Sequence, residues 1–169
     1  MDLKRELLKA HSVKQTRNIV DYVGDSPGRF KELIAVFLAG PYRVTQRAAW
    51  PMSYCVEAHS HLINPHFNVV LSMLTKTGVH DAVKRNVLRL LQFVEIPKRY
   101  QGKVVQHCFN FLNDPKEPIA VRVFAMSVLA NIAKHEPDLK KELRIIIEDQ
   151  LPYGSPAYVS RARKVLKSL

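Results

Sequence analysis

Four arginines recur along the chain at nearly equal intervals. They are Arg47, Arg85, Arg122 and Arg161, separated by 38, 37 and 39 residues. A guanidinium group offers five donors in a planar fork, which suits phosphate and carboxylate groups, so a column of arginines could bind an acidic partner. The alternative, which we favour, is structural. Helix ends leave carbonyls without partners, and arginines at this spacing would donate to those carbonyls and to turn aspartates between repeats.

A second basic group lies around Arg85. Arg85, Arg89 and Gln92 follow i, i+4, i+7 spacing and share one helix face, with Lys84 beside them. A phosphate backbone could lie along this face, and its binding would then depend steeply on salt. The simpler interpretation is a solvated helix face.

Trp50 and Tyr54 are four residues apart, one helical turn from Arg47. An aromatic pair beside an arginine can stack a nucleobase or anchor a peptide. Aromatic residues at helical spacing more often belong to a core, and that alternative stays open. These two residues join the arginine groups as candidate partner-binding residues.

The densest set of potential metal ligands comprises Cys55, Glu57, His59, His61 and His66. On one helix, the Cys55/His59 and Glu57/His61 pairs point in different directions and could not converge on a single ion unless the helix breaks before His61. The chain also lacks a phosphate-binding P-loop, a Rossmann glycine fingerprint and a nucleophile elbow. We therefore expect no metal, no cofactor and no catalytic residues.

The composition bounds the class of protein. The 169 residues are 47% hydrophobic and 24% charged, with a formal net charge of +11. No apolar run approaches the roughly 20 residues that cross a bilayer, so no membrane span is expected. The charged start, Met1 to Glu6, does not look like a secretory signal, and Cys55 and Cys108 lie in apolar helical surroundings. We expect a cytoplasmic protein whose basic excess attracts nucleic acid or acidic protein surfaces.

Paired helices must position these residues. A period near 40 with two apolar helices in each period is typical of a helical solenoid. We predict an all-α fold, an α-α superhelix in one domain over residues 1–169, with an N-terminal cap at 1–28 and second helices lining a concave wall. The repeats are expected at 30–65, 66–101, 102–137 and 138–169. Pro51 falls inside the second helix of the first repeat, where it predicts a kink or a late helix start.

The third repeat carries a recognisable pattern. Leu112-Asn113-Asp114-Pro115 is followed by Val121-Arg122 and by the apolar Ala125, Leu129 and Ile132. This arrangement resembles the HEAT repeat, in which an aspartate marks the turn and an arginine opens the second helix. The resemblance covers about residues 30–169, although Gly40-Pro41 in the first repeat lacks the turn aspartate.

The whole chain resembles small bacterial single-domain HEAT-like proteins without an assigned activity. Some of them bear the name of adenylosuccinate lyases, which are much longer and use a mobile Ser-Ser-x-Met-Pro loop. No such loop is present, since Gly154-Ser155-Pro156 is a turn and a helix start, so lyase activity is not expected. HEAT-like DNA alkylation-repair glycosylases are similar in architecture and use tryptophans with a catalytic aspartate. Trp50 is the single tryptophan and its helix carries no aspartate, which argues against that activity.

The sequence thus predicts a non-catalytic interaction module that binds a protein partner on its basic concave surface. An interface on so short a solenoid would bury about 800 Å² per partner. Binding of DNA is the alternative, through the basic stripe around Arg85 and Arg89 together with the C-terminal basic cluster of Arg161, Arg163, Lys164 and Lys167. Neither the identity of the partner nor the oligomeric state follows from the sequence.

Overall fold

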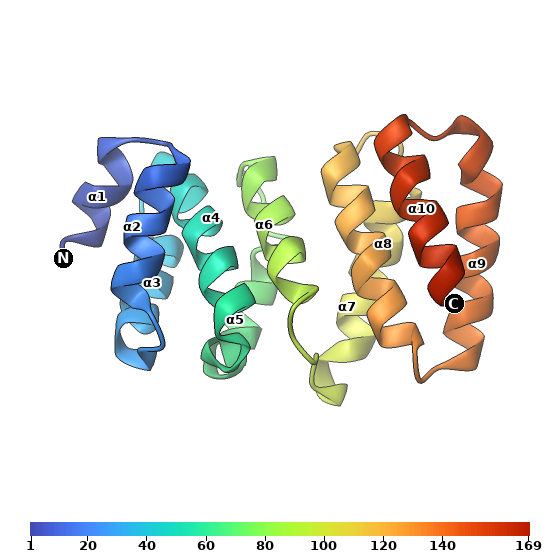
Figure 1. Ribbon diagram of the computed structural model, residues 1–169, viewed down its shortest axis with the longest axis horizontal. Helices are drawn as coiled ribbons and strands as arrows, with labels where there is room; N and C mark the ends of the chain where they lie inside the picture. The colour runs from blue at the N-terminus through green and yellow to red at the C-terminus, as the bar shows by residue number, and fades with distance from the viewer. The chain divides into compact units, whose positions relative to one another are not determined.

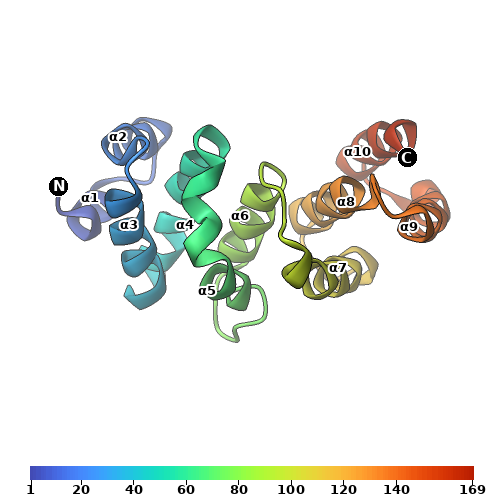
Figure 2. The ribbon, with the colours of Figure 1, turned by 90° about the horizontal axis from the view of Figure 1, so that it is seen from below.

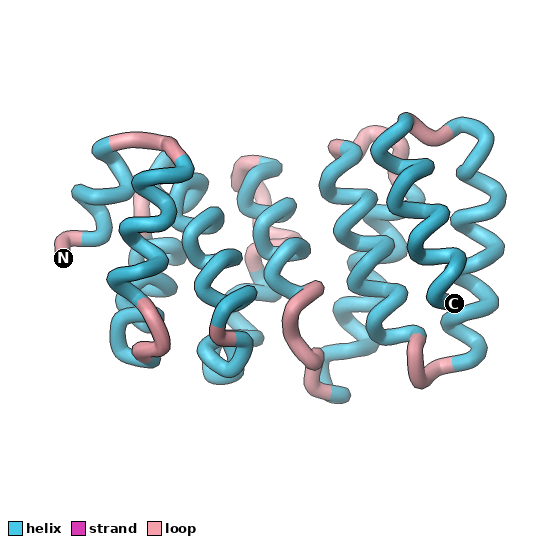
Figure 3. Tube along the Cα trace, in the orientation of Figure 1, coloured by secondary structure: helices cyan, strands magenta, loops and turns pink.

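The computed structural model describes residues 1–169, and all of its regular secondary structure is helical (Figure 3). It contains ten α-helices, two short 3-10 helices and no strand. The predicted all-α class is confirmed, and the paired helices are consistent with an α-α superhelix. The chain folds into two compact units, Met1–Val94 and Glu95–Leu169. The single domain predicted over residues 1–169 stays a prediction.

The N-terminal unit has six α-helices and one 3-10 helix. Their bounds are α1 Leu3–Lys9, α2 Val13–Val23, α3 Pro27–Ala39, α4 Tyr42–Ala58, η1 Ser60–His66, α5 Phe67–Ser72 and α6 Asp81–Leu91. Helices α2, α4 and α6 lie side by side in one layer, with α1 and α3 packed behind α2 and α4 (Figures 1 and 2).

Short local signals set the helix ends of this unit. The hydroxyls of Ser12 and Ser26 accept hydrogen bonds from backbone amides in the first turns of α2 and α3. His80 caps α6, because its Nδ1 accepts from the amide of Ala82 at 2.9 Å. Gly40 separates α3 from α4, and a Cβ there would lie 2.6 Å from the carbonyl oxygen of Val36, so only glycine fits this close turn.

Helix α4 continues through Pro51. The predicted late start is wrong: the helix begins at Tyr42, because buried residues ahead of the proline, Ala48 and Ala49 among them, hold the first turns in the core. The alternative, a kink at Pro51, stays a prediction. The helix ends at Ala58, because His59 leaves helical geometry and a 3-10 helix carries the chain past Pro65.

The C-terminal unit contains two helical hairpins. The bounds are α7 Lys98–Asn113, α8 Ile119–Ala133, α9 Pro137–Gln150, η2 Leu151–Tyr153 and α10 Pro156–Ser168. Helix α8 contacts α7, α9 and α10, and most of its residues are buried, so it forms the centre of the unit. The hydroxyl of Ser155 caps α10, with Pro156 at its first position as the sequence indicates. The predicted repeat boundary at residues 101 and 102 falls inside the first turn of α7.

Candidate functional site

Arg47 is part of the scaffold of the N-terminal unit. Its Nη1 donates to the carbonyl oxygens of Leu7 at 3.0 Å and Leu8 at 3.1 Å, at the end of α1. These carbonyls belong to the last turn of a helix and have no partner within it. Arg47 therefore ties α1 to α4, as the structural interpretation of the arginine column expects.

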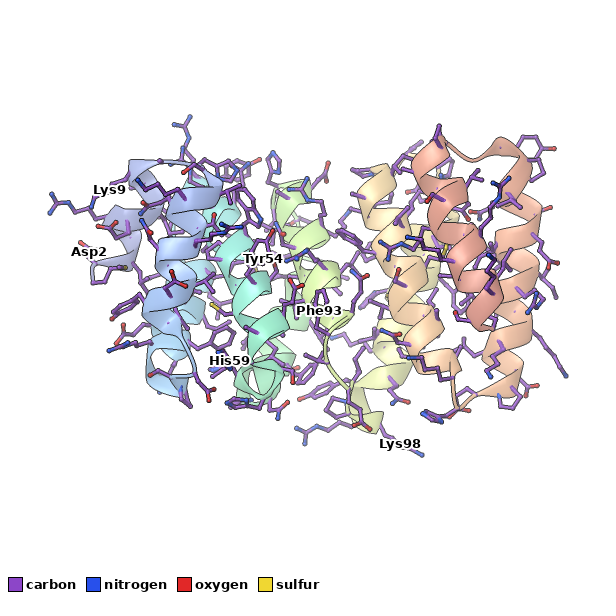
Figure 4. The ribbon with its side chains drawn as sticks, in the orientation of Figure 1. Asp2, Lys9, Tyr54, His59, Phe93 and Lys98 are labelled. Carbon is purple, nitrogen blue, oxygen red and sulfur yellow. The ribbon has the colours of Figure 1, made fainter.

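Arg89 lies at the centre of an aromatic and polar cluster on α4 and α6. Its Nη1 donates to the Ser53 hydroxyl at 2.8 Å, and its Nη2 pairs with the Glu57 carboxylate. The guanidinium carbon lies 4.2 Å from the ring centroid of Tyr54 and 5.6 Å from that of Phe93. Figure 4 shows Tyr54 on α4 and Phe93 beside the end of α6. Both rings stay more than a third exposed, so the cluster forms part of the surface.

A cavity opens between α2 and α4, next to this cluster. Its volume is about 270 Å³. Trp50 is half-buried in its wall, with its ring centroid 5.2 Å from that of His11 and 6.4 Å from that of Tyr54. The lining is mainly apolar and consists of Val13, Thr16, Arg17, Val20, Trp50, Tyr54, Glu57 and Ala58. The predicted aromatic pair is therefore part of the wall of an open pocket.

The remaining candidates of α6 differ in their surroundings. Arg85 is exposed and makes no hydrogen bond or ion pair, whereas Arg89, one turn later, is half-buried and paired. Gln92 is half-buried and its Nε2 donates to the backbone carbonyl of Arg89 at 3.4 Å. Lys84 is also half-buried. Within this group, only Arg85 offers a charge that is both exposed and unpaired.

Two candidates lie in the C-terminal unit. Arg122 donates from Nε to the carbonyl of Leu112 at 3.2 Å and from Nη2 to Oε1 of Gln150 at 2.9 Å. Its guanidinium carbon also lies 5.0 Å from the centroid of Tyr158. Arg161 donates from Nη1 to the Ser127 hydroxyl at 2.7 Å. Both guanidinium groups hold helices of this unit together.

Seven of the nine predicted residues fall into two groups, and the other two, Lys84 and Gln92, are half-buried. Trp50, Tyr54 and Arg89 come together on one surface, with Arg85 one turn from Arg89. Arg47, Arg122 and Arg161 join helices within their own units.

Several residues of this surface do not stand out in the sequence. They are Val13, Arg17, Val20 and Phe93, and the same holds for Ser53, which is buried and accepts a hydrogen bond from Arg89. The contact between Arg89 and Ser53 is visible only in the structure, where a contact of similar separation, Arg161 to Ser127, joins α10 to α8.

The ligand-rich segment after Tyr54 serves other contacts. Cys55 is fully buried, and burial raises the pKa of its thiol to about 12. His59 and His61 both approach the Asp25 carboxylate, at 3.5 and 2.9 Å. His66 contacts the ring of Phe30 instead, with centroids 5.8 Å apart. No three His, Cys, Asp or Glu side chains are grouped so that they could hold a metal ion.

Comparison with known proteins places the chain in a family. A family model described as a HEAT repeat domain matches residues 3–169. The chain belongs to the HEAT repeat family. HEAT repeat proteins generally mediate protein interactions or act as scaffolds, and the family is typically non-catalytic. No curated protein and no solved structure matches the chain. None of its helices combines the length and the apolar character needed to cross a membrane.

Proposed function

We propose that this HEAT repeat protein is a non-catalytic interaction module and that a partner protein binds the exposed face of α2, α4 and α6. The observation that carries the proposal is the open cavity beside the half-exposed Trp50 and Tyr54. Tryptophan, tyrosine and arginine are the residue types enriched among those that dominate the energetics of protein interfaces, and the two aromatic ones bury a large area at little cost in side-chain freedom. All three types meet here, since Arg89 lies over Tyr54.

The arginine contacts favour a protein partner over nucleic acid. A phosphate backbone needs several exposed and unpaired cations along one face. Arg47, Arg89, Arg122 and Arg161 already donate to groups within their own units. Of the four arginines of the column, only Arg85 is exposed without a hydrogen bond or an ion pair. The arginine column is therefore largely engaged in holding the helices together, and the exposed cations of the C-terminal basic cluster, Arg163, Lys164 and Lys167, lie on α10 outside that column.

Site-directed photo-crosslinking tests this proposal. A photoreactive phenylalanine analogue at Tyr54 should give discrete protein adducts in a lysate of the source cells. The same analogue at Tyr153, which is 89% exposed in the C-terminal unit, is the matched control and should give none. Equal adducts from both positions, or none from either, would contradict the proposed surface.

Fluorescence anisotropy with labelled single-stranded and duplex DNA tests the alternative, which is DNA binding. We expect no binding that survives physiological salt. Binding with a steep salt dependence that Arg85→Ala abolishes would make nucleic acid the partner instead.

A further inference from the structure

We infer that the cavity between α2 and α4 receives an acidic amphipathic helix of the partner, with one apolar side chain inserted against Trp50. This inference rests on the proposed function and adds the chemistry of the bound segment. Size is the first argument. At about 270 Å³ the cavity lies just below the roughly 300–1,000 Å³ of sites that enclose a small molecule. It suits one large apolar side chain of a longer ligand.

The lining residues give the direction and length of the groove. Val13, Thr16 and Val20 contribute from one face of α2 at i, i+3 and i+7, and Trp50, Tyr54 and Ala58 follow one face of α4 at i, i+4 and i+8. At 1.5 Å per residue, either row extends for about 10–12 Å, or two helical turns. A cavity of this length between two helices fits a bound helix whose apolar anchor residues are one helical turn apart.

The charges around the cavity indicate which charge the bound helix carries. Arg17 is exposed on α2 and lines the cavity, and Arg85 is exposed on α6. The only carboxylate in the lining belongs to Glu57, which is already paired with Arg89. The N-terminal unit as a whole carries 13 Lys and Arg against 7 Asp and Glu. Complementary potential steers and orients partners, so the polar face of the bound helix should carry Asp and Glu.

The walls of the cavity suit a side chain better than a nucleobase. Bases bind single-strand sites by stacking on open aromatic faces. One face of Tyr54 is covered by the guanidinium of Arg89 at 4.2 Å, and the ring of Trp50 is approached by that of His11. Val13 and Val20 add aliphatic surface, which gains most from burying an apolar group. These contacts favour a peptide anchor.

Selection from a displayed library of random helical peptides on the full chain tests the inference. Enriched peptides should carry a net negative charge and apolar residues at i and i+3 or i+4. Because Trp50 is the single tryptophan, its emission should shift when a synthetic copy of an enriched, tryptophan-free peptide binds.

Two exposed positions supply the variants. Ala58→Phe fills the cavity and Arg17→Glu reverses the charge of its rim, and each should weaken binding at least about tenfold, equivalent to about 1.4 kcal/mol. Arg163→Glu makes the same charge change on α10 and should leave the affinity unchanged. Circular dichroism of each variant checks that it is folded.

The outcomes separate this inference from the proposed function. Enriched peptides that are neutral or basic, or that bind Ala58→Phe as tightly as the unchanged protein, would overturn the acidic helix. A selection that enriches no peptide would also overturn the acidic helix. Specific crosslinks at Tyr54 would in that case still support the proposed interaction surface. Crosslinks at Tyr54 that are absent, or equal to those at Tyr153, would contradict the surface itself.

Discussion

Replacing Arg122 with methionine should cost the C-terminal unit a measurable part of its stability. Arg122 donates to Leu112 and Gln150 and lies over Tyr158, so one side chain joins α8 to the ends of α7 and α9 and to the start of α10. Gln150 extends the network, because it also accepts from the Tyr158 hydroxyl at 2.7 Å and donates to Asn113 at 3.0 Å. Methionine keeps part of the apolar stem but none of these donors.

The size of the effect follows from the contacts that are lost. A hydrogen bond from a charged donor contributes about 1.5–3 kcal/mol when it is well shielded, and a half-buried one falls towards the lower end. The contact with Tyr158 adds about 0.5–1 kcal/mol. Gln150 keeps a donor in Tyr158, whereas the Leu112 carbonyl loses the guanidinium. We expect the free energy of unfolding to fall by about 2–3 kcal/mol.

Urea unfolding followed by circular dichroism measures this loss. With a slope of about 2 kcal/mol per molar urea, the midpoint should fall by about 1–1.5 M. Arg163→Met removes an exposed, unpaired arginine of the same unit and should change stability by less than about 0.5 kcal/mol. Arg122→Lys should recover little, because one ammonium group cannot serve two acceptors in the geometry of a guanidinium. An Arg122→Met midpoint equal to that of Arg163→Met would refute the reasoning.

Three further predictions concern groups whose pKa is shifted by burial. Cys55 and Cys108 are fully buried, and burial raises the pKa of both thiols. An aromatic disulfide that reacts with thiols should therefore label both cysteines in denaturant at about pH 8 and neither in the folded protein. Labelling of the folded protein would contradict this prediction. Burial lowers the pKa of His66 and of His107, so the unfolded state binds protons first and the free energy of unfolding should fall as the pH drops below about 6.5. Urea titrations of His66→Gln and His107→Gln should show that the free energy of unfolding depends less on pH than in the unchanged protein. An unchanged dependence would contradict this prediction. Burial raises the pKa of Tyr158, so stability should be lost as the pH rises above about 10, where the unfolded tyrosine ionises first. The loss should shrink in Tyr158→Phe, and tyrosinate absorbance of the folded protein should show one delayed group.

The helices were predictable because their signals are local. The Ser155-Pro156 start of α10 and the Gly40 break between α3 and α4 act within a few residues and stand where the structure has them. The end of α4 was not predictable in this way. The apolar pattern continues past Ala58, but His59 and His61 turn towards Asp25, which lies more than thirty residues away. That contact exists only after α2, α3 and α4 have packed.

The candidate site was predictable only in part for the same reason. Trp50 and Tyr54 were visible as a pair at helical spacing, but the cavity they line needs the valines of α2 as its second wall. The sequence of α2 predicts part of a terminal cap, and nothing in it indicates that this helix borders an open cavity. The ion pair of Arg89 was not predictable either, because its partner Glu57 lies 32 residues earlier on another helix.

The regular spacing of the arginines and the position of the cavity have a common explanation. In a stack of helix pairs, equivalent positions face equivalent neighbours, so a residue type that recurs with the repeat tends to serve contacts every pair needs. Arg47, Arg122 and Arg161 fit this, since each donates to a group within its unit. Trp50 departs from the period. It lies three residues after Arg47, and the positions three residues after the other arginines of the column hold Leu88, Ala125 and Lys164. A contact needed by every pair would not require tryptophan at one position alone. The residue that breaks the repeat is therefore the better guide to binding, and it lines the open cavity.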